Sequence, residues 1–221
     1  MIRAMSPMNQ MLKINEIFYS VQGEAHSSGF PTVFVRLTGC PLRCSYCDTA
    51  YAFKDGNSKT LTDILHSVEQ YKTAHVCITG GEPLAQPHVH QLMHLLCEHQ
   101  YQVSIETSGA FDIAQIDPRV SIVMDIKTPS SNEIHRNLFD NLKHIKPTDQ
   151  IKFVISDERD FHWAKSILEE KTLHQLCTVW FSPTHPSMPP HQLADLILEH
   201  QLPVRFQVQL HKVLWGDTPG K

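Results

Sequence analysis

Short apolar runs alternate with helical patterns along most of the chain. The runs are rich in β-branched and aromatic residues, which favour strands. The pattern predicts a strand pair around 14–21, followed by seven strands at 32–37, 75–79, 103–107, 121–126, 150–155, 178–181 and 204–208. Apolar residues recur at helical spacing in most of the gaps, so helices are predicted at 61–68, 89–96, 133–143, 158–170 and 190–200. Strands that alternate with helices in this way are typical of a parallel sheet.

The 221 residues are enough for one large α/β domain, and no change in composition marks a second one. We expect a disordered leader over residues 1–12, which follow no clear apolar pattern, and a single domain over 13–221. Six or seven strand–helix units of this length predict an α/β fold, either an incomplete (β/α) TIM-like barrel or an open doubly wound sheet. Both folds bind ligands at the carboxyl ends of their strands.

Polar residues and glycines do follow the predicted strands at those ends. The segments concerned are Gly39-Cys40, 79–83, 106–109, 125–127, Ser182-Pro183 and 209–211. Lys152 lies within the fifth of the seven strands. The chain therefore has the material for a polar site at one edge of the sheet.

Composition and charge exclude several classes of partner. The net charge of −4 provides no basic stripe for a nucleic-acid backbone. No segment approaches the roughly 20 apolar residues of a membrane span, and the first residues lack the apolar core of a secretory signal. Cys77, Cys97 and Cys177 fall in apolar runs, where a free thiol packs as a small core residue and suits a reducing compartment. We expect a cytoplasmic protein with neither a nucleic-acid nor a membrane partner.

Three more cysteines, Cys40, Cys44 and Cys47, stand close together in a segment that begins with Gly and Pro and reads as a loop. Three thiolates leave one coordination position of a metal centre open, whereas a closed zinc site or an ordinary iron–sulfur cluster has four protein ligands. Three alternatives are buried cysteines on one helix face, a zinc site completed by His26 or Asp48, and disulfides. An open position on a redox metal points to catalysis.

A second motif, Gly80-Gly81-Glu82-Pro83, directly follows a predicted strand. Bare backbone N–H groups at the glycines can approach a small ligand, and Glu82 can receive an ammonium group. With the cysteine spacing, this motif resembles the radical S-adenosylmethionine superfamily. The resemblance implies that Cys40, Cys44 and Cys47 bind a 4Fe-4S cluster, and that S-adenosylmethionine chelates the open iron and is cleaved to methionine and a 5′-deoxyadenosyl radical.

The same resemblance implies which residues contact S-adenosylmethionine. Gly81 is expected beside its methionine part, with Glu82 as the partner of its ammonium group. Asp125, Ile126 and Lys127, together with Ser182, are expected beside its nucleoside part.

Longer segments narrow the resemblance. Residues 16–24, 34–40, 47–49 and 209–216 resemble the 7-carboxy-7-deazaguanine synthase family, whose barrel core is trimmed. The resemblance implies conversion of 6-carboxy-5,6,7,8-tetrahydropterin to 7-carboxy-7-deazaguanine with loss of ammonia, early in queuosine biosynthesis. It also implies Mg²⁺, a homodimer and an electron donor such as flavodoxin.

A carboxylated pterin requires a cation for its carboxylate and hydrogen bonds for its amide-like edge. Arg36 is the predicted clamp for the carboxylate, with a surface salt bridge as its alternative role. The backbone of Val21, Gln22 and Gly23 is predicted to contact the ring edge. Further expected residues are Thr79 and His211 at the substrate and, by resemblance, Thr49 at Mg²⁺.

Two departures from the family pattern concern the site. Ala25 stands where the family usually has Gly, so a positive φ there would cost about 1 kcal/mol or more. Asp125-Ile126-Lys127 stands where many relatives have Ser-Pro-Lys, which affects the expected nucleoside contacts. Two rival functions stay open at this point, a radical activase that acts on a partner protein and a metal-binding module without enzymatic activity.

Overall fold

A nine-stranded sheet runs through the computed structural model, which describes residues 10–216, 218 and 220. Its strands are β1 (Met11–Val21), β2 (Pro31–Leu37), β3 (Asn57–Thr60), β4 (His75–Gly80), β5 (Gln102–Thr107), β6 (Ser121–Asp125), β7 (Gln150–Ile155), β8 (Thr178–Pro183) and β9 (Arg205–Phe206). The α-helices are α1 (Leu61–Glu69), α2 (Val89–Glu98), α3 (Glu158–Glu170), α4 (Leu173–Leu176), α5 (Pro190–Glu199) and α6 (Leu210–Trp215). Short 3-10 turns are η2 (Ala50–Phe53), η3 (Pro83–Ala85), η4 (Pro129–Ser131), η5 (Ile134–Arg136) and η6 (Phe139–His144).

The strand order is β3-β1-β2-β4-β5-β6-β7-β8-β9. β1 is antiparallel to both of its neighbours, β2 and β3, and every other neighbouring pair is parallel. The predicted run of parallel strands is confirmed, and the sheet is consistent with a partial TIM-like barrel. Their carboxyl ends therefore share one edge of the sheet, as a strand-end site requires.

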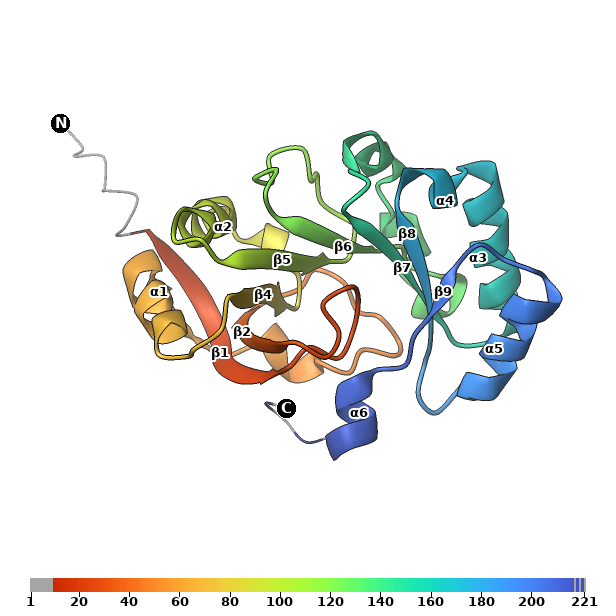
Figure 1. Ribbon diagram of the computed structural model, residues 1–221, viewed down its shortest axis with the longest axis horizontal. Helices are drawn as coiled ribbons and strands as arrows, with labels where there is room; N and C mark the ends of the chain where they lie inside the picture. Colours follow the sequence, from red (N-terminus) through yellow and green to blue (C-terminus); the bar gives the residue numbers. More distant parts are fainter. Residues whose placement is uncertain (1–9, 217, 219, 221) are drawn as a thin grey trace.

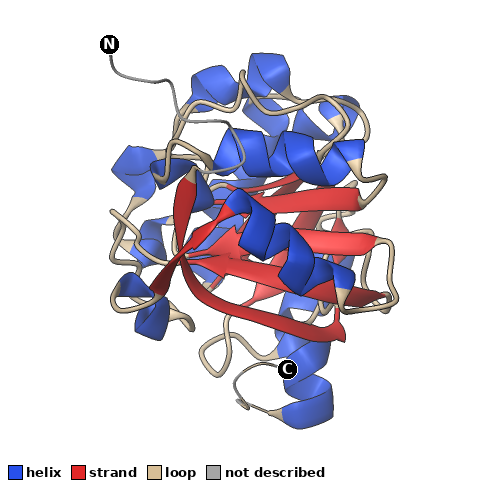
Figure 2. Ribbon diagram, turned by 90° about the vertical axis from the view of Figure 1, so that its left-hand side faces the viewer, coloured by secondary structure: helices blue, strands red, loops and turns tan. Residues whose placement is uncertain are grey.

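Helices flank the curved sheet, with α1 and α2 beside its first strands and α3 and α5 beside its last (Figure 1; Figure 2). α1 shows why these helices form where the pattern predicted them. Thr60 caps its first turn in a reciprocal pair with Asp63, and the residues at helical spacing behind the cap are buried. No helix in the described part of the chain combines the length and apolar character needed to span a bilayer.

Residues 22–30 connect β1 to β2 and contact the last strands of the sheet, on the side where the partial barrel does not close. Within the described residues β9 pairs only with β8. The backbone N–H of Ala25 donates to the side-chain oxygen of Gln207 at 2.9 Å, and that of His26 donates to Gln150 at 2.8 Å. The first and last parts of the chain thus meet around one cavity.

Three expectations for local structure were wrong. The strand pair predicted around 14–21 is one continuous strand, β1, which pairs with β2. The leader was expected to extend to residue 12, but β1 begins at Met11 and Leu12 is buried; residues 1–9 lie outside the described residues. Residues 133–143 form two 3-10 turns instead of an α-helix. Asn137 breaks the helical pattern because its amide bonds both the N–H and the carbonyl of Lys127.

Candidate active site

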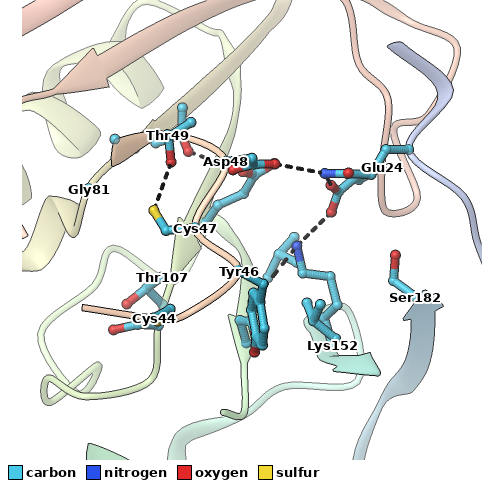
Figure 3. A pocket seen from close by; sticks show the side chains of 18 of the residues that line it. Glu24, Cys44, Tyr46, Cys47, Asp48, Thr49, Gly81, Thr107, Lys152 and Ser182 are labelled. Atoms are coloured by element: carbon cyan, nitrogen blue, oxygen red, sulfur yellow. Dashed lines mark hydrogen bonds and ion pairs between the residues drawn. The ribbon is translucent and has the colours of Figure 1, made fainter. Parts of the chain in front are cut away.

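A cavity of about 250 Å³ lies at the carboxyl ends of the strands. The predicted site residues that line it are Val21, Gln22, Arg36, Cys40, Cys44, Cys47, Thr49, Thr79, Gly81, Asp125, Lys127, Ser182 and His211. Gly23, Glu82 and Ile126 are outside this lining. Residues from both ends of the sequence therefore share one cavity (Figure 3).

The loop that carries Cys40, Cys44 and Cys47 follows β2 and has no helical segment before η2. All three thiols are free and partly exposed, which excludes the disulfide and buried-helix alternatives. Burial raises the pKa of Cys44 to about 11, although Lys127 opposes the shift. Ser45 anchors the loop, because its N–H donates to the carbonyl oxygen of Ser131 at 3.2 Å.

The zinc alternatives do not agree with the geometry. His26 makes a 3.1 Å contact with the Thr178 hydroxyl and does not line the cavity. Within the described part of the chain, no three His, Cys, Asp or Glu side chains converge as ligands of a single metal ion would. Three free thiols in one cavity wall match the donor set of an iron–sulfur cluster with one open position.

Gly81 lies directly against the cysteine loop. A Cβ atom at this position would overlap the carbonyl oxygen of Gly39 and would stand 2.6 Å from Cys40 Cβ. The N–H of Glu82 donates to that same Gly39 carbonyl at 2.9 Å, which fixes the approach. Only glycine permits this approach, which brings the cysteine loop directly against the end of β4 at the cavity.

Glu82, the expected partner of a ligand ammonium group, lies outside the cavity lining. Its side chain is completely buried, and its carboxylate accepts hydrogen bonds from the N–H groups of Leu84 and Ser108 and from the hydroxyls of Thr107 and Ser108. The carboxylate therefore joins the turn after β4 to the end of β5. Its acceptor positions are taken by the protein itself.

Asp125 ends β6, and of residues 125–127 two reach the cavity, Asp125 and Lys127. Lys127 Nζ lies 3.1 Å from Asp125 Oδ2, and the other oxygen of Asp125 is buried without a partner among the described residues. Ile126 was expected in the same group, but its side chain packs in the core and its N–H donates to the Lys152 carbonyl. Alternation of side chains along an extended segment explains this difference. Ser182 reaches the cavity from β8.

Glu24 and Lys152, which both line the cavity, form an ion pair with Lys152 Nζ 2.6 Å from Glu24 Oε2 (Figure 3). Gln209 donates to the other carboxylate oxygen at 2.8 Å. Burial raises the pKa of Glu24, but the charge and hydrogen bond of Lys152, the hydrogen bond from Gln209 and the charge of His211 together outweigh burial, so the net shift is downward. Both groups are therefore charged at neutral pH.

The predicted backbone contacts of Val21, Gln22 and Gly23 are largely occupied by the protein. Gln22 exchanges backbone hydrogen bonds with the strand connection, and the Gly23 carbonyl accepts from the N–H of Leu210 at 3.1 Å. A Cβ atom at Gly23 would lie 2.5 Å from His211 Nδ1. Glycine at this position thus lets α6 approach and brings His211 to the cavity, while the Gln22 side chain faces Glu106.

Arg36, Thr79 and Glu106 form another polar part of the lining. Arg36 is largely buried and binds Glu16 at 2.8 Å, so it is not a surface salt bridge. The Thr79 hydroxyl donates to Glu106 at 3.1 Å, and Gln22 Nε2 lies 3.4 Å from the same carboxylate. This part combines a cationic donor with an acceptor for N–H groups.

Thr49 lies at the end of the cysteine loop. Its hydroxyl is 3.8 Å from Cys47 Sγ, and the neighbouring Asp48 accepts from Gln209 at 3.3 Å. Figure 3 shows Thr49 beside Cys47, on the same stretch of loop as Asp48. A hydroxyl and a carboxylate are thus available next to the thiols.

Three lining residues with direct roles in this geometry were not among the predicted site residues, namely Glu24, Glu106 and Lys152. Lys152 did carry a signal, because a charge inside an apolar strand must find a partner. Glu106 stands at a strand end, as a site residue should. The partner of Lys152 could not be read from the sequence.

The sequence of the chain is similar to those of known proteins. The family model described as the radical SAM superfamily matches residues 34–148. The chain is 41% identical over 213 residues to the 7-carboxy-7-deazaguanine synthase of Chlorobaculum tepidum, covering 95% of this chain and 97% of that one. It is 37% identical to the protein of the same name from Koribacter versatilis, covering 95% and 100%.

The fold has a counterpart among solved structures. The crystal structure of QueE from Escherichia coli superposes with a TM-score of 0.76 and 23% identity, covering 91% of this chain and 95% of that chain. At this level of identity the likeness concerns the fold alone. It supports the partial barrel described above.

Proposed function

Because the chain belongs to the 7-carboxy-7-deazaguanine synthase family of the radical S-adenosylmethionine superfamily, we propose that it converts 6-carboxy-5,6,7,8-tetrahydropterin to 7-carboxy-7-deazaguanine. Ammonia is released, and the product enters queuosine biosynthesis. The observation that carries this proposal is the cavity itself. One strand-end cavity holds three free thiols next to a polar part that suits a carboxylated, N–H-rich ring.

Cys40, Cys44 and Cys47 would hold a 4Fe-4S cluster with one iron open. Gly81 would admit the methionine part of S-adenosylmethionine, while Asp125, Lys127 and Ser182 would contact the nucleoside part. The unpartnered oxygen of Asp125 supports this placement, since a buried acceptor needs a donor such as a ribose hydroxyl. When bound, the cluster and S-adenosylmethionine supply the one-electron chemistry that abstracts a hydrogen atom from the substrate.

The chain's own residues orient the substrate. Arg36 binds the carboxylate, and Glu106 accepts from the N–H groups of the pterin with Gln22 and Thr79 beside it. His211 covers the substrate from α6. Burial of these groups excludes water and fixes the ring in one orientation relative to the thiols.

Thr49 would give a hydroxyl oxygen to Mg²⁺, whose remaining ligands are substrate oxygens and water. The support is its position beside Cys47 in the same cavity. Mg²⁺ would then orient the substrate while the ring rearranges.

We further propose a cytoplasmic homodimer that receives electrons from a small carrier such as flavodoxin. Val213 and Leu214 on α6 are 68% and 52% exposed, an apolar surface that a second copy would cover. The net charge of −4 agrees with the absence of a nucleic-acid partner.

An anaerobic assay tests the reaction. The protein is reconstituted with iron and sulfide and given reductant, S-adenosylmethionine, Mg²⁺ and the carboxylated tetrahydropterin, and the product is identified by mass. We expect 7-carboxy-7-deazaguanine from the wild type and from Cys97→Ala, whose thiol packs in the core away from the cavity. Cys44→Ala is expected to lose the cluster, cleavage of S-adenosylmethionine and product together.

Other outcomes separate the parts of the proposal. Cleavage of S-adenosylmethionine without a deazapurine would contradict the synthase function and favour an activase. A cluster of unchanged iron content in Cys44→Ala would contradict the ligand assignment.

A further inference from the structure

Arg36 is held from one side. It stands opposite Glu16 in the β1–β2 register, and its Nε donates to Glu16 Oε1 at 2.8 Å. Neither terminal nitrogen of Arg36 hydrogen-bonds another protein group among residues 10–216, 218 and 220. The guanidinium therefore keeps an unpaired fork, the part that matches a planar carboxylate.

A second group donates a hydrogen bond to the Glu16 carboxylate. The Tyr51 hydroxyl donates to Glu16 Oε1 at 2.9 Å, so Glu16 accepts from both Arg36 and Tyr51. The guanidinium carbon of Arg36 lies 5.8 Å from the centre of the Tyr51 ring and 5.6 Å from that of Phe18. The guanidinium is thus confined by two rings and one carboxylate.

Tyr51 also belongs to the loop that carries Thr49. It lies in η2, where the N–H of Ala52 donates to the Thr49 carbonyl at 2.9 Å. The Ala52 carbonyl in turn accepts from the N–H of Gly39 at 2.8 Å, which ties the turn to the end of β2. A displacement of the Thr49 loop would therefore move Tyr51 and, through Glu16, Arg36.

Net charge does not explain how this site would bind an anion. The charges of Glu16 and Glu106 both act on Arg36, and they offset its positive charge. Affinity for a carboxylate then depends on the orientation of the fork, and a preoriented fork loses less side-chain freedom when the ligand binds.

We propose that Glu16 and Tyr51 are positioning residues of the substrate site. They hold the fork of Arg36 toward the carboxylate of the substrate and make that orientation depend on the loop that carries Thr49. The inference rests on the proposed function, in which Arg36 binds that carboxylate.

Calorimetric titration of the reconstituted enzyme tests this inference. The protein carries S-adenosylmethionine and Mg²⁺, and no reductant is added, so no turnover occurs. Kd is measured for 6-carboxytetrahydropterin and for tetrahydropterin without the carboxyl group. The Kd of tetrahydropterin divided by the Kd of 6-carboxytetrahydropterin reports recognition of the carboxylate. A general loss of folding would weaken binding of both ligands and would not change this ratio selectively.

For the wild type we expect a ratio of about 10 to 100, the range for a hydrogen-bonded charged group. Arg36→Met should bring the ratio close to one. Tyr51→Phe and Glu16→Met should lower it by roughly 3- to 10-fold, as loss of one orienting hydrogen bond predicts. Glu16→Gln keeps an acceptor oxygen and should retain most of the ratio.

Matched controls are Tyr19→Phe, which alters a tyrosine stacked on Tyr71, and Glu98→Met, which removes one of the two acidic partners of Arg119 on the surface. Both should keep the wild-type ratio. If Arg36→Met loses the ratio while Tyr51→Phe and Glu16→Met keep it, the positioning role is wrong and the proposed function stands. If the wild type binds neither ligand, the proposed function itself fails.

Discussion

Lys152 Nζ lies 2.6 Å from Glu24 Oε2, across 128 residues of sequence. Both side chains are close to 90% buried, with exposures of 12% and 10%. The pair joins β7 to the connection after β1, on the open side of the sheet. The ion pair therefore links two parts of the cavity lining that no strand pairing connects.

Removal of one partner of this pair should destabilise the protein strongly. We expect Glu24→Gln to lower the free energy of unfolding by about 3 kcal/mol, because the buried Lys152 would lose its nearest counter-charge and keep the more distant Asp125, whose Oδ2 lies 4.0 Å from Nζ. The double variant Glu24→Gln with Lys152→Met should cost less than the sum of the single changes. Urea unfolding measures each value.

A surface pair provides the control. Lys171 Nζ lies 2.7 Å from Glu170, but both side chains are at least one third exposed. Glu170→Gln should therefore change stability by about 0.5 kcal/mol or less. Equal effects of Glu24→Gln and Glu170→Gln would show that the buried pair contributes no more than a surface pair.

The same pair should make stability depend on pH. The pKa of Glu24 is lowered in the folded protein, so its contribution is fully present above its ordinary pKa of 4.5 and is lost as pH falls through the folded value. The difference in unfolding free energy between wild type and Glu24→Gln should shrink as pH is lowered below 4.5. A difference that stays constant across this range would contradict the lowered pKa.

Ala25 occupies the left-handed region, with a φ of 64°. Since an L-residue pays about 1–2 kcal/mol there, Ala25→Gly should raise the free energy of unfolding by about 0.5–1 kcal/mol after the loss of one buried methyl group. Ala164→Gly, the same change inside α3, should lower it by about 2 kcal/mol, because helix propensity and a fully buried methyl group are both lost. Opposite signs in urea unfolding confirm the conformation; equal losses would contradict it.

Glu82 provides a test between a structural role and a ligand role. Glu82→Gln replaces one acceptor oxygen by an amide and leaves donors from Thr107 or Ser108 unpaired, so stability should fall by about 2 kcal/mol. Thermal unfolding and titration with S-adenosylmethionine measure both effects on the same sample. Weaker binding with unchanged stability would favour the ligand role that the sequence predicted.

Most of the fold could be predicted from the sequence because its signals are local. The apolar runs of β2 and β4 to β8 and the helical spacing of α1 and α2 each report the burial of their own element. The helix predicted over residues 133–143 does not form, because the Asn137 side chain hydrogen-bonds the backbone of Lys127. The spacing of apolar residues within 133–143 gives no information about this contact. Ile126 was expected beside the nucleoside by resemblance, but side chains alternate along an extended segment and its own packs in the core.

The cysteine trio and the glycine beside it were determined by the sequence alone. Ligands spaced three and four residues apart on one loop face one site in any fold that keeps the loop. The partners of Glu24, Glu82 and Arg36 were decided only by the tertiary structure. Their contacts cross the sheet, and the order and register of the strands, not the spacing of residues along the chain, determine which polar groups meet.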